Sequence, residues 1–205
     1  MARKKEKIEP EHILVVIVEG DADELIIDRL MKFYKNYGLK MRTRIENTHG
    51  FPNEAKIRQK LKKVETFSSV PIVFDTVVCE YDTDVFVKKI QLEPDWKKVE
   101  ADLKHNYNLL HFCRIEAKTS IEDWMLDDLD GLLMALNLPL DTQLKGHNGQ
   151  EKVKNLFQKK NIEYDKHKGK EKIKPIMDKL DIAKIREARK KELKEFETLF
   201  GIEVK

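Results

Sequence analysis

A short apolar run near the start of the chain limits the fold more than any other feature. Residues 12–18 read His-Ile-Leu-Val-Val-Ile-Val, and the run stops at Glu19 and Gly20. An apolar segment this short, rich in β-branched side chains, is typical of a strand buried on both faces of a parallel sheet. The rest of the chain must therefore provide helices that cover both faces of one sheet.

Helices and strands are expected to alternate after this run. Residues 22–37 carry apolar side chains at helical spacing and end before a glycine, and residues 41–45 alternate with two arginines as a second strand. A helix is expected over residues 53–64 and a third strand over residues 76–81. This order of elements predicts parallel pairing with right-handed crossovers.

The second half of the chain is expected to add one strand and several helices. The apolar pattern predicts helix 95–105, strand 109–115, helix 121–138, helix 151–160 and helix 181–200. Residues 145–149 are the best linker candidate. The expected organisation is a basic arm over residues 1–11, an α/β domain with about four mainly parallel strands over residues 12–145, and a basic helical extension over residues 146–205 that packs on it.

Charged residues are abundant and unevenly distributed. The chain has 40 Lys and Arg and 37 Asp and Glu, together 38% of its residues, for a net charge of +3, whereas an average domain has roughly 25%. Residues 75–130 hold 14 acidic and 7 basic side chains, and residues 151–205 hold 11 acidic and 17 basic ones. An acidic middle with basic flanks fits a divalent-metal site inside a surface that binds a polyanion. The alternative is two ordinary solvated faces.

We expect neither a membrane span nor a disulfide framework. No segment approaches the roughly 20 consecutive apolar residues of a span, and the apolar run after the basic start is too short for a signal peptide. Two cysteines, Cys79 and Cys113, are too few for a disulfide framework or a zinc site and favour a reducing cytoplasm. Cys79 and Trp124 are expected in the core.

Carboxylates follow the predicted strands where those strands end. Glu19 closes the first strand with Asp23 one helical turn later, Asp82 and Asp84 close the third, and Glu122 follows the fourth. Functional groups of parallel α/β sheets gather at this carboxyl edge. Two residues apart in an extended segment, Asp82 and Asp84 would point to the same side. Together they could grip a hard cation such as Mg2+ or Mn2+, which prefers carboxylate oxygens.

This arrangement resembles a known family. Glu19-Gly20 after one apolar strand, followed by Asp82-Thr83-Asp84 after another, is similar to the Toprim signature shared by topoisomerases, bacterial primases and several nucleases. Within that superfamily the chain resembles the OLD (overcoming lysogenization defect) nucleases and the small RloB-like proteins. The further features that carry this resemblance, which spans roughly residues 12–170, are Asp23, the segment Thr119-Ser120-Ile121-Glu122-Asp123-Trp124, and Tyr164-Asp165-Lys166.

The resemblance implies a nuclease that hydrolyses phosphodiester bonds of DNA, with RNA as the alternative, through a two-metal site. One Mg2+ or Mn2+ ion would be held by Glu19, Asp82 and Glu122. The second ion would be held by Asp23, Asp82 and Ser120, and Asp84 would complete the shell.

Basic residues receive two roles in this interpretation. A lysine of the 166–170 loop would stabilise the charge of the transition state; Lys166, Lys168 and Lys170 all lie there, and the sequence does not choose among them. Other basic side chains would follow the phosphate backbone without reading bases, namely Arg42, Arg44, Lys56, Arg58, Lys60 and Lys170.

The chain also departs from the family it resembles. OLD proteins carry an ATPase domain, but the Gly-x-x-x-x-Gly-Lys-[Ser/Thr] motif does not occur here. The resemblance therefore implies a stand-alone Toprim domain, acting in defence against phage or mobile DNA, with any ATPase partner encoded separately; the oligomeric state stays open, a homodimer included. Asp23 stands where the family more often has Glu, which supports an alternative: a weak or inactive module that only binds nucleic acid. A primase-like transferase would need a zinc-binding domain and a longer chain.

Overall fold

The centre of the molecule is one parallel β-sheet. The computed structural model describes residues 9–89 and 91–204, so residues 1–8 of the expected basic arm lie outside the described residues. The strand order is β2-β1-β3-β4, and every pairing is parallel. The strands are β1 (Glu11–Val18), β2 (Arg42–Asn47), β3 (Ile72–Asp82) and β4 (His111–Ala117). The predicted α/β class with about four parallel strands is confirmed.

Helices connect the strands and form the C-terminal region. The first four are α1 (Asp21–Lys35), α2 (Glu54–Thr66), α3 (Asp84–Val87) and α4 (Trp96–Tyr107). After β4 follow α5 (Ile121–Leu126), α6 (Leu129–Ala135), α7 (Gly149–Gln158), α8 (Lys170–Met177), α9 (Ile182–Ala188) and α10 (Lys190–Leu199). No helix among the described residues is both long and apolar enough to cross a membrane.

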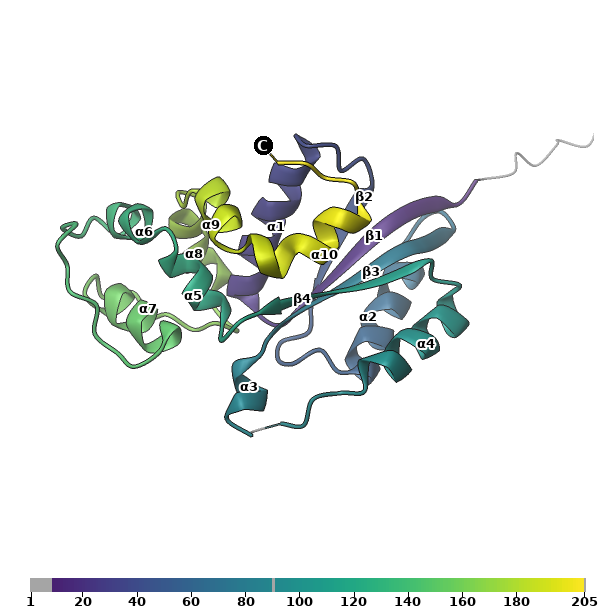
Figure 1. Ribbon diagram of the computed structural model, residues 1–205, viewed down its shortest axis with the longest axis horizontal. Helices are drawn as coiled ribbons and strands as arrows, with labels where there is room; N and C mark the ends of the chain where they lie inside the picture. Colours follow the sequence, from purple (N-terminus) through teal and green to yellow (C-terminus); the bar gives the residue numbers. More distant parts are fainter. Residues whose placement is uncertain (1–8, 90, 205) are drawn as a thin grey trace, which may run out of the picture.

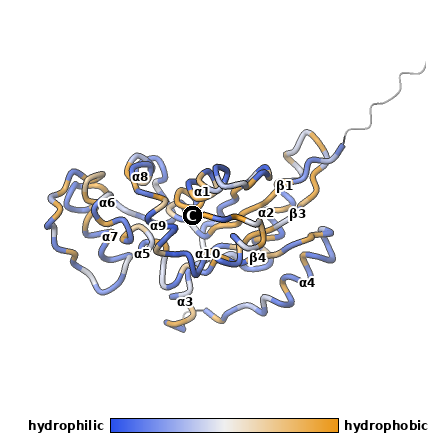
Figure 2. The backbone as a smooth tube through the Cα atoms, turned by 45° about the horizontal axis from the view of Figure 1, so that its top comes forward, coloured by the Kyte–Doolittle hydropathy of each residue, from blue (hydrophilic) through white to orange (hydrophobic). Residues whose placement is uncertain are grey.

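The helices cover both faces of the sheet (Figure 1). Helices α2 and α4 lie on one face, and α1, α5 and the C-terminal helices lie on the other. Because side chains alternate along a strand, β1 feeds both cores: Val16 packs on the α1 side and Val15 on the α2 side. Figure 2 shows the hydrophobic colour running along β1 and β3. The first apolar run is thus a strand buried on both faces, as its composition predicts.

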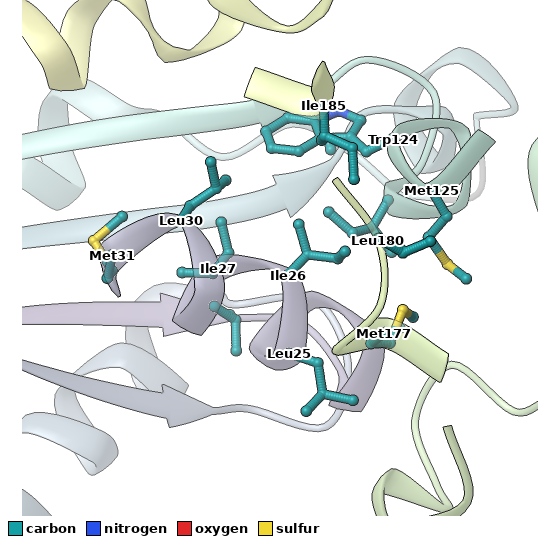
Figure 3. Packing of buried hydrophobic residues seen from close by; sticks show 14 of the residues in the cluster. Leu25, Ile26, Ile27, Leu30, Met31, Trp124, Met125, Met177, Leu180 and Ile185 are labelled. Carbon is teal, nitrogen blue, oxygen red and sulfur yellow. The ribbon is translucent and has the colours of Figure 1, made fainter. Parts of the chain in front are cut away.

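The larger core joins α1 to the C-terminal region. Figure 3 shows Ile26 and Leu30 of α1 among Trp124, Leu180 and Ile185. Trp124 and Cys79 are fully buried, as predicted. A polar network adds to this packing, because the hydroxyl of Tyr34 in α1 donates to Glu197 of α10 at 2.7 Å and Arg186 of α9 holds the same carboxylate with two hydrogen bonds. The C-terminal helices therefore fix α1, which carries part of the site.

Two of the predicted long helices are wrong, because each is broken in the middle. Helix 121–138 divides into α5 and α6 at Asp128, whose carboxylate accepts a hydrogen bond from the backbone of Gly131. Helix 181–200 divides into α9 and α10 at Arg189, whose guanidinium binds Asp127. Arg189 and Asp127 are 62 residues apart, so local periodicity does not reveal this contact.

Candidate metal centre

The site lies at the carboxyl edge of two neighbouring strands. Glu19 follows the last residue of β1 and Asp82 is the last residue of β3, and β1 and β3 are paired in the sheet. The backbone N–H of Asp82 donates to the Glu19 carboxylate at 3.3 Å. Asp23 comes from the first turn of α1 and Glu122 from the first turn of α5. The structure therefore brings these four predicted residues to one edge, and all four are buried.

Three carboxylates form the tightest part of this cluster. Asp23, Glu80 and Asp82 each offer an oxygen that lies within 4.8 Å of the other two. Both oxygens of Asp23 and both of Glu80 are buried without a hydrogen-bond partner. A buried carboxylate without partners is costly unless it is protonated or a cation lies beside it. The donor set and its orphaned oxygens therefore fit a hard divalent cation.

Glu80 is the site residue that the sequence interpretation missed. It lies inside β3 between Cys79 and Tyr81, where an apolar residue is the ordinary expectation. Because side chains on a strand alternate, Glu80 points to the same face of the sheet as Asp82, two residues later. This two-residue spacing back from Asp82 is the signal that would have identified Glu80.

Lys166 places its ammonium group within the acidic cluster. Its Nζ lies 2.5 Å from an oxygen of Asp82, 3.4 Å from Asp23 and 3.5 Å from Glu19, and its side chain is only 5% exposed. Lys168 is exposed. Lys170, in α8, pairs with Glu24 at 2.6 Å. Of the three lysines between which the sequence could not choose, the structure brings Lys166 to the carboxylates.

The backbone of Lys166 is fixed against the start of α1. Its carbonyl oxygen accepts hydrogen bonds from the N–H groups of Asp21 at 2.8 Å and Ala22 at 3.2 Å, which have no partner within the helix. A Cβ at Gly20 would lie 2.8 Å from the same oxygen, closer than real side chains come. Gly20 therefore allows the Lys166 segment to approach, and the C-terminal region completes the site.

Burial controls the protonation of this cluster. Burial raises the pKa of Asp23 to about 6, although Lys166 opposes the change and Glu19 and Glu122 add to it. Burial also raises the pKa of Glu80 and of Asp82 well above the ordinary range. For Lys166 burial lowers the pKa, but the surrounding carboxylates outweigh it and leave the pKa well above its usual value. The lysine is therefore charged, and it only partly compensates its acidic neighbours.

Helix α5 and Tyr164 orient the remaining predicted groups. The N–H of Ile121 donates to Asp82 at 2.9 Å, which joins the start of α5 to the end of β3. The Tyr164 hydroxyl donates to Glu122 at 2.9 Å. Ser120 is buried directly before α5, and its hydroxyl contacts Asp123 at 3.2 Å. Tyr164, singled out with Lys166 in the sequence, thus holds Glu122 in place.

Asp84 does not share the orientation expected for it. The expected extended segment through Asp82 and Asp84 is wrong, because β3 ends at Asp82 and Asp84 is the first residue of the short helix α3. The Asp84 carboxylate pairs with Lys88 at 2.6 Å on the partly exposed side of that helix. The pattern of alternate sides holds only while the chain stays extended.

The predicted nucleic-acid-binding residues do not surround the acidic cluster. Arg42 opens β2 at the amino edge of the sheet and pairs with Glu11, and Arg44 lies 3.7 Å from Glu46. Arg58 pairs with both Glu54 and Asp102. Lys56 and Lys60 lie on α2, and Lys170 is tied to Glu24.

Comparison with known proteins assigns no family. No protein-family model matches the chain, and no curated protein or solved structure is significantly similar to it. The function must therefore be inferred from the parallel sheet and from the acidic cluster at its carboxyl edge.

Proposed function

We propose that this protein is a divalent-metal-dependent nuclease of the Toprim type that hydrolyses phosphodiester bonds, with DNA favoured over RNA. The observation that carries the proposal is the buried group of Asp23, Glu80 and Asp82 at the carboxyl edge of parallel strands, with orphaned carboxylate oxygens. The Glu19-Gly20 and Asp82-Thr83-Asp84 signature ends strands β1 and β3 at this edge, which supports the same interpretation.

The proposed centre assigns separate tasks to its side chains. Asp23, Glu80 and Asp82 would hold Mg2+ or Mn2+, with Glu19 and Glu122 beside them. Such an ion supplies an activated water and stabilises charge on the leaving oxygen. Lys166 provides a fixed positive charge next to Asp82, where it would stabilise the charge of a reacting phosphate. Tyr164 keeps Glu122 in one orientation through its hydrogen bond.

One observation favours a second candidate function. The Lys166 ammonium already contacts three carboxylates, so the cluster has an internal cation. If that lysine is a permanent counter-ion, the protein is a module that binds nucleic acid without cutting it. The two candidates differ in one measurable property, because only the nuclease requires the carboxylates to take up a divalent ion.

A cleavage assay tests the proposal. The purified protein is incubated with supercoiled DNA, single-stranded DNA and structured RNA in Mg2+, Mn2+ or Co2+. We expect metal-dependent cleavage that Asp82→Asn and Glu80→Gln reduce by more than the roughly 10- to 100-fold typical of residues that only support a metal ligand. Asp130→Asn, an exposed carboxylate of α6, is the matched control and should cleave normally. Absence of cleavage, together with unchanged nucleic-acid binding in both cluster variants, would establish the binding module instead.

A further inference from the structure

Three lysines form one stripe along α2. Lys56, Lys60 and Lys63 follow one another at intervals of four and three residues, so they lie above one another on the helix surface. Each precedes a residue that is buried against the sheet, namely Ile57, Leu61 and Val64. The stripe therefore runs along the edge of the packed face of α2. Helix α2 lies on the side of the sheet opposite α1 (Figure 1).

The stripe begins next to the carboxyl edge of the sheet, where the acidic cluster lies. The Lys56 ammonium lies 3.1 Å from the position that a Cβ at Gly50 would take, and the N–H of Gly50 donates to the Glu19 carbonyl at 2.7 Å. At the other end, Lys63 pairs with Glu46 of β2 at 3.0 Å. Arg44 lies 3.7 Å from the same carboxylate. Positive charge thus continues from the loop beside Glu19 to the arginines of β2.

The stripe leads to a hollow at the amino edge of the sheet. Its volume is about 400 Å³, within the range of small-ligand sites. Residues from β1, β2, β3 and the end of α2 line it, among them Ile13, Val64, Ile72, Arg42, Arg44 and Phe67. The side chain of Phe67 is 73% exposed. An exposed aromatic ring beside two guanidinium groups provides a stacking surface for an unpaired base and charges for its phosphates.

The charges around this path leave a positive surplus. Among the residues that the structure describes, Arg42, Arg44 and Lys63 form ion pairs with two carboxylates, Glu11 and Glu46. Within the described part of the chain, Lys56 and Lys60 form no ion pair. The Arg42 side chain is 62% exposed, so its pair with Glu11 is of the weak, solvent-screened kind that a phosphate can replace.

The length of the path suits a short strand of nucleic acid. Arg42 stands beside Ile13 in the sheet register, and Glu19 lies six residues further along the chain of β1. At about 3.3 Å per residue this separation is about 20 Å. Single-strand-binding domains engage about 4 to 16 nucleotides, so a segment of a few nucleotides can extend from the hollow to Glu19 at the carboxyl edge.

We propose that the α2 lysine stripe and the hollow beside Phe67 bind single-stranded nucleic acid, with an unpaired base stacked on Phe67 and its phosphates held by Arg42 and Arg44. This inference rests on the proposed function for the direction of the strand toward the acidic cluster, and it specifies single-stranded or frayed substrate. A paired duplex keeps its bases stacked internally and offers none to Phe67.

Fluorescence anisotropy in EDTA tests this site without any metal. The probes are a labelled 12-nucleotide single-stranded DNA, an RNA of the same length and a closed hairpin duplex. We expect tighter binding of the single strands than of the duplex. Phe67→Ala should weaken single-strand binding about 5- to 150-fold, and Phe67→Trp should restore it. Because Phe67 is exposed, neither change should alter the melting temperature.

The lysine stripe is tested by a matched pair on the same helix. Lys60→Ala should reduce the slope of log affinity against log salt by about 0.7. Lys62→Ala removes the same charge about a third of a turn away from the stripe and should leave the slope unchanged.

The proposal is overturned if the wild-type protein fails to bind single strands, if Phe67→Ala binds like the wild type, or if both lysine variants change the slope equally. Because EDTA removes metal, the expected binding results can be obtained even if the nuclease proposal fails. If the protein cleaves nucleic acid but does not give these binding results, only the proposed binding site is rejected.

Discussion

The two edges of the same sheet hold ion pairs of similar chemistry in opposite settings. At the carboxyl edge, the side chains of Lys166 and Asp82 are 5% and 6% exposed. At the amino edge, those of Arg42 and Glu11 are 62% and 27% exposed. Each member of a buried pair depends on the other, since losing one leaves an uncompensated charge, whereas an exposed pair contributes about 0 to 1 kcal/mol. The carboxyl edge is therefore built to retain a cation, and the amino edge can exchange one anion for another.

Removing the buried lysine should have the largest effect. Lys166→Met keeps an unbranched side chain, one atom shorter, but leaves Asp82, Asp23 and Glu19 without their cation. In EDTA at pH 8 we expect a loss of about 3 to 5 kcal/mol in the free energy of unfolding, measured with urea. Lys168→Met, an exposed lysine of the same loop, should change it by less than about 0.5 kcal/mol. Equal effects of the two substitutions would show that the buried contacts of Lys166 contribute no more to the free energy of unfolding than an exposed lysine does.

Replacing Asp23, whose pKa is raised, should have the next largest effect on stability. Its pKa in the fold is about 6 against an ordinary 3.8, so folding favours the protonated carboxyl. That contribution is complete below pH 3.8 and is lost as the pH rises through 6. Asp23→Asn imitates the protonated group, so in EDTA it should exceed the wild type in stability by up to about 3 kcal/mol at pH 8.

The difference in unfolding free energy between Asp23→Asn and the wild type should shrink toward pH 4, where Asp23 is protonated in the wild type as well. Urea unfolding at pH 4, 6 and 8 measures it. A difference that stays constant over this range would contradict the assignment of the raised pKa to Asp23.

The exposed pair at the amino edge should give the smallest effect. Arg42→Ala removes the contact with Glu11, and we expect a change of less than about 1 kcal/mol in unfolding free energy. The same variant should bind single-stranded DNA more weakly, because Arg42 is proposed to hold a phosphate. A large loss of stability without a loss of binding would contradict the account, because it would show that the Arg42–Glu11 pair supports the fold and does not hold a phosphate.

The strands and the positions of most site carboxylates could be predicted from sequence because both depend on local pattern. A β-branched run that stops at Glu19 indicates a strand and its end, and parallel pairing places that end beside Asp82. Glu80 was missed because it occupies an inward position of β3 that is ordinarily apolar. Its burial is explained only by the neighbours Asp23 and Asp82, which the fold brings to it.

Contacts between distant parts of the chain account for the other differences. The choice among Lys166, Lys168 and Lys170 depends on the Lys166 carbonyl docking on the start of α1, which no spacing within the loop reveals. The break between α9 and α10 coincides with the contact between Arg189 and Asp127. The position of Arg42 far from the acidic cluster follows from the strand register, which places it beside Ile13 at the opposite end of β1.

Calorimetric titration of Mn2+ tests the central claim, that Asp23, Glu80 and Asp82 form a cation site. We expect the wild-type protein to bind Mn2+, Glu80→Gln to bind at least about 10-fold more weakly, and the exposed control Asp130→Asn to bind normally. Lys166→Met should bind more tightly than the wild type, because no ammonium group competes for the carboxylates. If the wild type takes up no Mn2+, or if Glu80→Gln binds with unchanged affinity, the acidic cluster is not a metal centre.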